Sequence, residues 1–298
     1  MTGPDRFVDL PEGPRICYRV EGPDDGVPVL LIAGLGLDLT SWPRRMVEGL
    51  LDRGARVVVF DNRDAGCSTR VRAPSPSPLH SVLGRPGPDS YDLGDMATDT
   101  VGLLDHLGIE RAHVVGMSMG GMIGQTLAAR HPDRAATLTS IFSTTGRRRV
   151  GRVAWSSLVR MGGPPARTVE ESVRRHLAFL RHIGSAVFPP DRAEEVAWAT
   201  GLWERAGGVR ARSGVPRQIG AIHASGDRTR ELARIGAPTL VVHGDVDLMV
   251  HPSGGRATAR AVPGARFVEI EGMAHHLAPG VVDRLAGLIG DHTARVRI

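Results

Sequence analysis

The chain has 298 residues, of which 41% are hydrophobic and 23% charged, so it is long enough to bury a large core and is not typical of disorder. It has no apolar run long enough to span a bilayer, no apolar segment near its start and only two cysteines, Cys17 and Cys67. We therefore expect a cytoplasmic protein without a signal peptide, a disulfide framework or a membrane partner. The net charge is +5 and all 37 Lys+Arg residues are arginine, which codon bias explains more simply than a nucleic-acid-binding face. Only 4% of residues are aromatic, which argues against a stacking platform for single-stranded nucleic acid, so we expect no nucleic-acid partner.

The first half of the chain alternates between two kinds of segment. Short apolar runs rich in β-branched residues predict buried strands at residues 27–33, 56–60, 112–116 and 136–142. Amphipathic segments predict helices at residues 93–107 and 121–131, and Pro132 ends the second helix. Strands that alternate with helices in this way predict an α/β fold with a mostly parallel sheet flanked by helices.

The pattern changes after Gly146. Helices are predicted at residues 168–183 and 193–205, with no convincing strand before Arg230. Strands then return at residues 238–243 and 265–270, followed by a helix at 281–294. We therefore predict an α/β core formed by residues 1–145 and 231–298, interrupted by a helical cap at residues 146–230.

Charge also separates this insert from the rest of the chain. Residues 146–230 contain sixteen arginines and seven acidic residues, whereas the remainder contains 21 arginines and 25 acidic residues. Such an asymmetry is typical of a separate module. Two interpretations stay open: codon bias with arginines solvated at the surface, or a local field that attracts an acidic substrate.

A motif that suits nucleophilic catalysis lies after the predicted strand at 112–116. Gly116-Met-Ser118-Met-Gly120 joins a strand to a helix, and the glycines leave room for a tight turn that exposes the serine hydroxyl. Ser118 is therefore the candidate nucleophile. The alternative is a glycine-rich packing turn, which would not require acidic and basic partners further along the chain.

Such partners follow in the order that the motif requires. Asp247 lies after the strand at 238–243 and His275 lies after the strand at 265–270, so both belong to loops at the sheet edge that carries Ser118. His275 is the candidate base and Asp247 is the acid that orients it. Asp245 is an alternative acid and His276 is an alternative base.

An oxyanion hole needs two N–H donors beside the nucleophile. The backbone amide of Met119, directly after Ser118, is one candidate. Leu35 is the other, because it lies in the Gly34-Leu35-Gly36 loop after the first predicted strand. The alternative for that loop is an ordinary connection.

The loop at residues 61–68 contains Asp61, Arg63 and Asp64 and invites comparison with a phosphate or metal loop. We interpret it instead as a turn whose charges satisfy one another. No spacing of ligands typical of a metal site and no dinucleotide-binding glycine motif is present, so we expect no metal and no cofactor.

Five motifs together resemble the α/β-hydrolase superfamily over nearly the whole chain. They are residues 31–36 through Trp42, residues 61–68, the turn at Ser118, residues 244–247 and residues 272–275. Within that superfamily the chain is most similar to small bacterial esterases such as aclacinomycin methylesterase, which act on polyketide-derived esters. One departure is Ala33-Gly34 before Leu35, where many relatives have His-Gly.

The resemblance implies that Ser118 is the nucleophile, His275 the base and Asp247 the orienting acid, with Leu35 and Met119 at the oxyanion hole. It implies a cofactor-free serine hydrolase that cleaves a small-molecule carboxylic ester, such as the methyl ester of a polyketide-type compound. The alternatives are the same triad used for C–C bond hydrolysis, acyl transfer or perhydrolysis, and a non-catalytic binding module on this fold. The sequence does not specify the oligomeric state.

Overall fold

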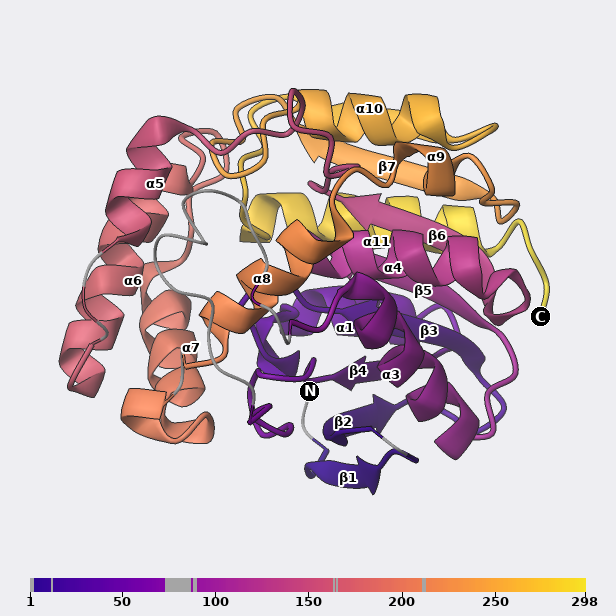
Figure 1. Cartoon of the computed structure of the whole chain (residues 1–298), viewed down its shortest axis with the longest axis horizontal. Coiled ribbons are helices and arrows are strands. Elements are labelled where there is room, and N and C mark those ends of the chain that lie inside the picture. The colour runs from indigo at the N-terminus through magenta and orange to yellow at the C-terminus, as the bar shows by residue number, and fades with distance from the viewer. Residues whose placement is uncertain are drawn as a thin grey trace.

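The computed structural model describes residues 3–11, 13–72, 87, 90–162, 164, 166–210 and 213–298. These residues form an eight-stranded sheet in the order β1-β2-β4-β3-β5-β6-β7-β8 (Figure 1). The strands are β1 (Arg6–Asp9), β2 (Arg15–Glu21), β3 (Val27–Ile32), β4 (Ala55–Phe60), β5 (Ala112–Met117), β6 (Ala135–Ile141), β7 (Thr239–Gly244) and β8 (Arg266–Ile270).

Strands β3 to β8 are parallel, whereas β1 and β2 add an antiparallel edge. The six parallel strands coincide with the six predicted from apolar runs, and the predicted α/β fold with a mostly parallel sheet is confirmed. The sequence analysis missed β1 and β2. Both contain exposed, charged residues in place of a continuous apolar run, as befits an edge hairpin.

Helices cover both faces of the sheet. They are α1 (Arg44–Leu51), α3 (Leu93–His106), α4 (Met119–Arg130), α9 (Thr229–Leu232), α10 (Ser253–Ala261) and α11 (Pro279–Thr293). Helices α1 and α11 pack against each other and against one face. Helices α3, α4 and α9 cover the other face, and α10 packs beside α9.

The alternation of side chains along β3 shows how the two cores arise. Leu30 and Ile32 belong to the cluster beneath α3 and α4, whereas Val29 and Leu31 belong to the cluster beneath α1 and α11. All four are at most 1% exposed. A central strand buried on both faces needs apolar residues at every position, which is why it is a continuous apolar run in the sequence.

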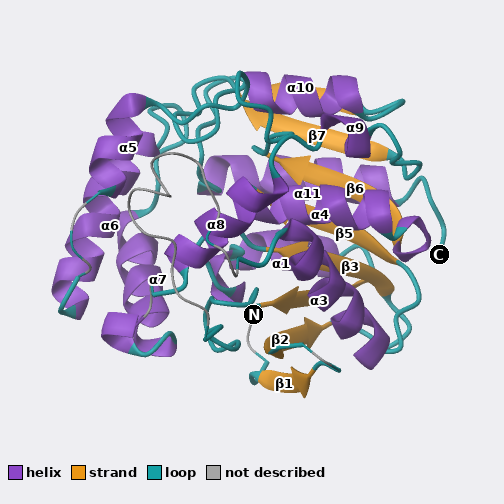
Figure 2. Ribbon diagram, viewed as in Figure 1, coloured by secondary structure: helices purple, strands orange, loops and turns teal. Residues whose placement is uncertain are grey.

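The chain between β6 and β7 contains the helices α5 (Trp155–Met161), α6 (Val169–Ile183), α7 (Arg192–Arg205) and α8 (Val215–Ser225) and the short 3-10 helix η3 (Gly208–Arg210). Figure 2 shows α5, α6 and α7 standing beyond the arrowheads of β6 and β7, at the carboxyl edge of the parallel strands. We call α5–α8 the inserted helices. The domain boundaries at residues 146 and 230 stay a prediction.

The insert leaves and rejoins the core at one place. Gly146 has φ of 81°, and a Cβ there would collide with the carbonyl oxygen of Gly226, which itself has φ of 55°. Both positions therefore favour glycine, because side chains rarely adopt this backbone conformation.

Among the helices of the described residues, none combines the length and the apolar character that crossing a bilayer requires.

Candidate active site

Ser118 lies at the tip of a strained turn between β5 and α4. Its φ of 54° and ψ of −120° place it outside the usual regions for a residue with a side chain. The turn is fixed by a hydrogen bond from the Ser118 amide to the Ile141 carbonyl at 2.9 Å and by one from Ser143 Oγ to the Ser118 carbonyl at 2.8 Å.

Two glycines allow the turn to close. A Cβ on Gly120 would collide with the carbonyl oxygen of Ile32, and a Cβ on Gly116 would collide with the carbonyl oxygen of Gly120. The helix therefore starts in backbone contact with two strands. This close approach is the physical reason for the glycine spacing around Ser118 in the sequence.

The structure brings the three predicted catalytic side chains together. Ser118 Oγ lies 3.0 Å from His275 Nε2, and His275 Nδ1 lies 2.7 Å from Asp247 Oδ2. The residues come from the turn after β5 and the loops after β7 and β8, all at one edge of the sheet. A carboxylate on Nδ1 leaves Nε2 free to accept the serine proton.

Asp247 is held as a carboxylate. Burial alone would raise its pKa, but the charge of His275 and hydrogen bonds from His243 and His275 outweigh this and hold the pKa well below its usual range. Its other oxygen, Oδ1, accepts hydrogen bonds from the amides of Met249 at 2.7 Å and Val250 at 2.8 Å. The carboxylate is thus ionised and fixed in orientation.

The two alternative residues take different partners. Asp245 Oδ1 accepts a hydrogen bond from the Gly272 amide at 2.6 Å, which braces the loop before His275. His276 Nε2 lies 2.7 Å from Glu195 Oε1 on α7, so its ring faces the inserted helices and not Ser118. Adjacent side chains on an extended loop diverge, which explains why only one histidine reaches the serine.

The predicted oxyanion donors lie on two neighbouring segments. Met119 is the first residue of α4, and Leu35 lies in the turn after β3. A Cβ on Gly34 would lie 3.3 Å from Ser118 Cβ, so this turn lies against the candidate nucleophile. Within the described residues, no hydrogen bond engages the amide of Leu35 or Met119, so both are available to a ligand.

Three residues of the site were missed by the sequence analysis. Gln218 on α8 accepts a hydrogen bond from the Gly36 amide at 2.8 Å and donates one to the Arg63 carbonyl at 2.9 Å. The Phe142 ring lies 4.4 Å from the His275 ring, and His243 Nε2 lies 2.8 Å from the Val250 carbonyl and 3.4 Å from Asp247 Oδ2. Sequence spacing gives no signal for Gln218 or Phe142, because each acts through a contact between separate elements.

The charges in the loop at residues 61–68 do not pair with one another as expected. Its acidic residues do accept hydrogen bonds from nearby amides, but their cationic partners come from the inserted helices. Arg205 contacts Asp61 at 2.8 Å and Arg217 contacts Asp64 at 2.5 Å, whereas Arg63 pairs with Asp99 at 2.6 Å. The two buried carboxylates of the loop are therefore paired with arginines from outside the loop, because they point toward the insert.

Arg205 forms ion pairs with a cluster of three carboxylates. Its Nη1 contacts Asp38 and Asp61, and its Nη2 contacts Asp5. Burial raises the pKa of Asp61 to about 6; Arg205 works against the rise and Asp38 adds to it. Removing one partner would leave a buried charge uncompensated, which is costly.

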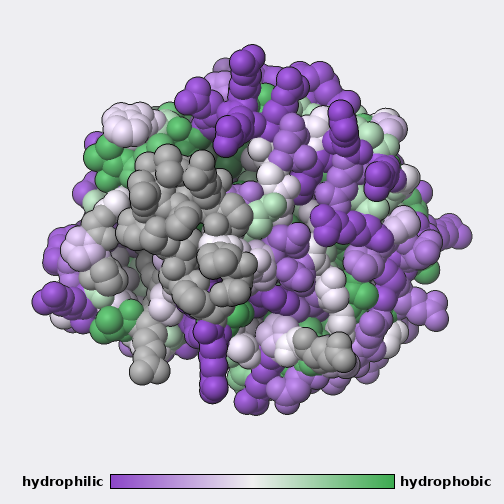
Figure 3. Space-filling model, viewed as in Figure 1, coloured by the Kyte–Doolittle hydropathy of each residue, from purple (hydrophilic) through white to green (hydrophobic). Residues whose placement is uncertain are grey.

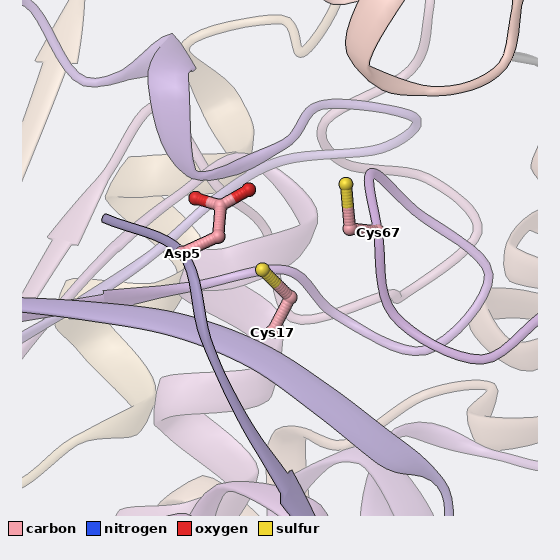
Figure 4. A group of neighbouring side chains, drawn as sticks. All are labelled: Asp5, Cys17 and Cys67. Atoms are coloured by element: carbon pink, nitrogen blue, oxygen red, sulfur yellow. The ribbon is translucent and has the colours of Figure 1, made fainter.

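Possible metal ligands occur beside this cluster. Figure 4 shows the thiols of Cys17 and Cys67 and the carboxylate of Asp5, whose ligand atoms all lie within 4.8 Å of one another. The guanidinium of Arg205 contacts Cys17 Sγ at 3.1 Å and Asp5 Oδ2 at 3.0 Å. Burial raises the pKa of both thiols. Two of the three possible ligands, Asp5 and Cys17, thus contact the Arg205 guanidinium, which a divalent cation would have to displace.

Comparison with known proteins identifies the family of this chain. The family model described as the alpha/beta hydrolase fold matches residues 27–278. The chain is 33% identical to the rhodomycin D methylesterase DnrP of Streptomyces peucetius, over 89% of this chain and 90% of that protein. It is also 33% identical to the rhodomycin D methylesterase DauP of Streptomyces sp. strain C5, over 97% and 98%.

A solved structure agrees over the same length. The enol-lactonase of Burkholderia xenovorans LB400 covers 97% of this chain and all of its own, with 26% identity and a TM-score of 0.74. Taken with the sheet order and the site geometry, these matches show that the chain belongs to the α/β-hydrolase family and is a hydrolase.

Proposed function

We propose that the protein is a serine hydrolase in which Ser118, His275 and Asp247 cleave a carboxylic ester. The observation that carries the proposal is the 3.0 Å contact between Ser118 Oγ and His275 Nε2. On the other side of the ring, His275 Nδ1 lies 2.7 Å from Asp247 Oδ2. The methylesterases that match nearly the whole chain support the ester class, and on that basis the protein is a carboxylic ester hydrolase.

The geometry supports a two-step reaction. Ser118 Oγ attacks the ester carbonyl while its proton passes to His275 Nε2, and the carbonyl electron pair moves onto the oxygen beside the amides of Leu35 and Met119. Collapse of this intermediate breaks the C–O bond, and the leaving alkoxide takes the proton from His275. Water then attacks the acyl-enzyme by the same route and releases the acid.

The class of substrate is a more specific proposal than the type of reaction. We infer a small-molecule ester, such as the methyl ester of a polyketide-type compound, because the two relatives that cover most of the chain are rhodomycin D methylesterases. The inserted helices α7 and α8, which contact His276 and the turn after β3, would form the wall of the substrate pocket.

The test is Ser118→Ala, with Ser156→Ala as a matched control at an exposed serine of α5. Methanol release from an aromatic polyketide methyl ester should fall at least ~1,000-fold in the first variant and remain unchanged in the second. Fluorophosphonate labelling should disappear only in Ser118→Ala. Full labelling of that variant, or products of C–C cleavage with no methanol, would contradict the proposal.

A further inference from the structure

Helix α5 has its polarity reversed relative to an ordinary surface helix. Ser157 points inward, where its hydroxyl lies 3.0 Å from His182 Nε2 and donates to the Leu248 carbonyl at 3.1 Å. At 100° per residue, Trp155 and Val159 lie about 160° away from Ser157 on the helix. Ser157 thus faces the protein, and Trp155 and Val159 lie on the opposite side, which faces solvent.

The outward side is strongly exposed. Trp155 is 78% exposed, Val159 61% and Leu158 46%, and Met161, about 40° from Ser157 on the helix, is 41% exposed at the edge of this side. Four large apolar residues in a helix of seven residues form a contiguous patch, which monomeric soluble proteins usually bury or use for binding.

Arginines lie near this patch in the sequence without acidic residues among them. Between Arg134, which pairs with Asp105, and Glu170 the chain has six arginines and no acidic residue. Arg149 and Arg152 lie in the segment that leads into α5, and Arg160 lies on it; all three are exposed, and none forms an ion pair within the described residues. Figure 3 shows hydrophobic atoms at the upper left, where Figure 1 places α5, beside hydrophilic atoms along the top.

The patch is fixed to the active-site edge of the core. The Ala154 amide donates to the Leu248 carbonyl at 3.0 Å, as does the Ser157 hydroxyl. Leu248 directly follows Asp247, so α5 rests on the loop that carries the proposed catalytic acid. A surface that contacts α5 would therefore lie at the side of the molecule where the site is.

We propose that Trp155, Leu158, Val159 and Met161, with Arg149, Arg152 and Arg160, form a surface that docks on an anionic phospholipid bilayer. Tryptophan with aliphatic neighbours suits the region between headgroups and acyl chains, and arginines suit the anionic headgroups. The surface would hold the enzyme peripherally, beside lipid-dissolved apolar esters. This revises the expectation of no membrane partner, which rested on the lack of a spanning segment.

Charge favours a bilayer over a second copy of the chain. A two-fold contact sets the same patch against itself, and the patch contains no acidic residue that could pair with the arginines of the other copy. A nucleic acid is also a poor partner for this surface. Its phosphates could contact the arginines, but tryptophan and aliphatic residues offer no hydrogen bonds to a phosphate backbone.

The test is co-sedimentation of the whole protein with vesicles of phosphatidylcholine alone or mixed with phosphatidylglycerol. Wild type should bind only the mixed vesicles, and binding should weaken as salt rises because exposed charges are screened. The variant Trp155→Ser/Val159→Ser should lose at least ~10-fold in partitioning. Arg149→Glu/Arg152→Glu/Arg160→Glu should lose about 100-fold, since each basic residue contributes about fivefold.

Matched controls separate the patch from general effects. Val27→Ser/Val209→Ser removes exposed apolar residues elsewhere, and Arg6→Glu/Arg295→Glu/Arg297→Glu makes the same charge change far along the chain. Both should bind vesicles as wild type does. All variants should hydrolyse a water-soluble ester at the wild-type rate, so the result does not depend on the proposed reaction.

Three outcomes would overturn the proposal. The first is no binding of wild type to phosphatidylglycerol vesicles at low salt. The second is equal losses in the patch variants and in the controls. The third is a dimer in sedimentation velocity that Trp155→Ser/Val159→Ser abolishes, which would assign the patch to self-association.

Discussion

Two residues beside His275, the proposed base, have backbone conformations that side chains rarely adopt. Ser118 has φ of 54° and Phe142 has φ of 35°, and each lies just beyond the end of a central strand. Such conformations cost about 1–3 kcal/mol each and persist only where the surroundings enforce them. Here the strain presents the Ser118 hydroxyl to His275 and lays the Phe142 ring against it.

The two acids of the loop after β7 give a residue-scale prediction. Asp247→Asn should lower ester turnover by about 10³–10⁴-fold, because an amide cannot hold His275 in the tautomer that accepts the serine proton. Asp245→Asn should have little effect, since its side-chain oxygen can still accept the hydrogen bond from the Gly272 amide.

Initial rates for both variants at one substrate concentration above KM measure this difference. Circular dichroism and thermal melts serve as controls for folding. Equal losses in the two variants, or a larger loss in Asp245→Asn, would show that Asp247 is not the orienting acid.

At the scale of elements, the turn after β3 depends on a helix almost two hundred residues away. Gln218 on α8 is fully buried and joins the Gly36 amide to the Arg63 carbonyl. Gly36 follows Leu35, whose amide is a proposed oxyanion donor. Gln218 is thus a positioning residue: it fixes the turn from the side of the insert.

Replacing Gln218 should affect catalysis more than substrate binding. Gln218→Leu removes both hydrogen bonds, and Gln218→Glu keeps the acceptor but sets a carboxylate oxygen against the Arg63 carbonyl. Both should lower kcat by ~10–100-fold with little change in KM, because a small misplacement of an oxyanion donor weakens only the transition state. A lower melting temperature with unchanged kcat per folded molecule would assign Gln218 a purely structural role.

The same elements show what the sequence can predict. Central strands buried on both faces are recognisable as apolar runs, and their loop residues Ser118, Asp247 and His275 follow the strand ends. The edge strands β1 and β2 lack this signal, and so does the inverted helix α5, whose apolar side faces outward. Gln218 and Arg205 were out of reach because their partners are set by how the insert packs on the core.

For the molecule as a whole, buried polar contacts join the insert to the core. Arg205 binds Asp5, Asp38 and Asp61, and Arg217 binds Asp64. These pairs account for part of the charge asymmetry between the insert and the rest of the chain: some arginines of the insert neutralise carboxylates of the core. Neither codon bias nor attraction of an acidic substrate is needed to explain those arginines.

A further contact of this kind joins the insert to the loop that carries His275. Glu195 on α7 lies between two histidines: Oε1 is 2.7 Å from His276 Nε2 and Oε2 is 2.6 Å from His176 Nε2. Burial alone would raise the pKa of Glu195, but these hydrogen bonds and the histidine charges lower it to about 2 from its ordinary 4.5. Because His276 follows His275, this carboxylate links α7 to the proposed base.

The lowered pKa of Glu195 makes stability depend on pH in a defined direction. A carboxylate whose pKa is lower in the folded than in the unfolded state stabilises the fold above pH 4.5, and this stabilisation is lost as pH falls from 4.5 toward 2. Allowing for solvent screening, we expect ~1–2 kcal/mol at neutral pH. Denaturant unfolding at several pH values should show Glu195→Gln less stable than wild type by this amount at neutral pH, with the gap closing in acid. Glu194→Gln, at an exposed neighbour without an ion pair in the described residues, should follow wild type throughout. A gap that stayed constant down to pH ~3 would contradict the link, because a difference in packing alone does not titrate.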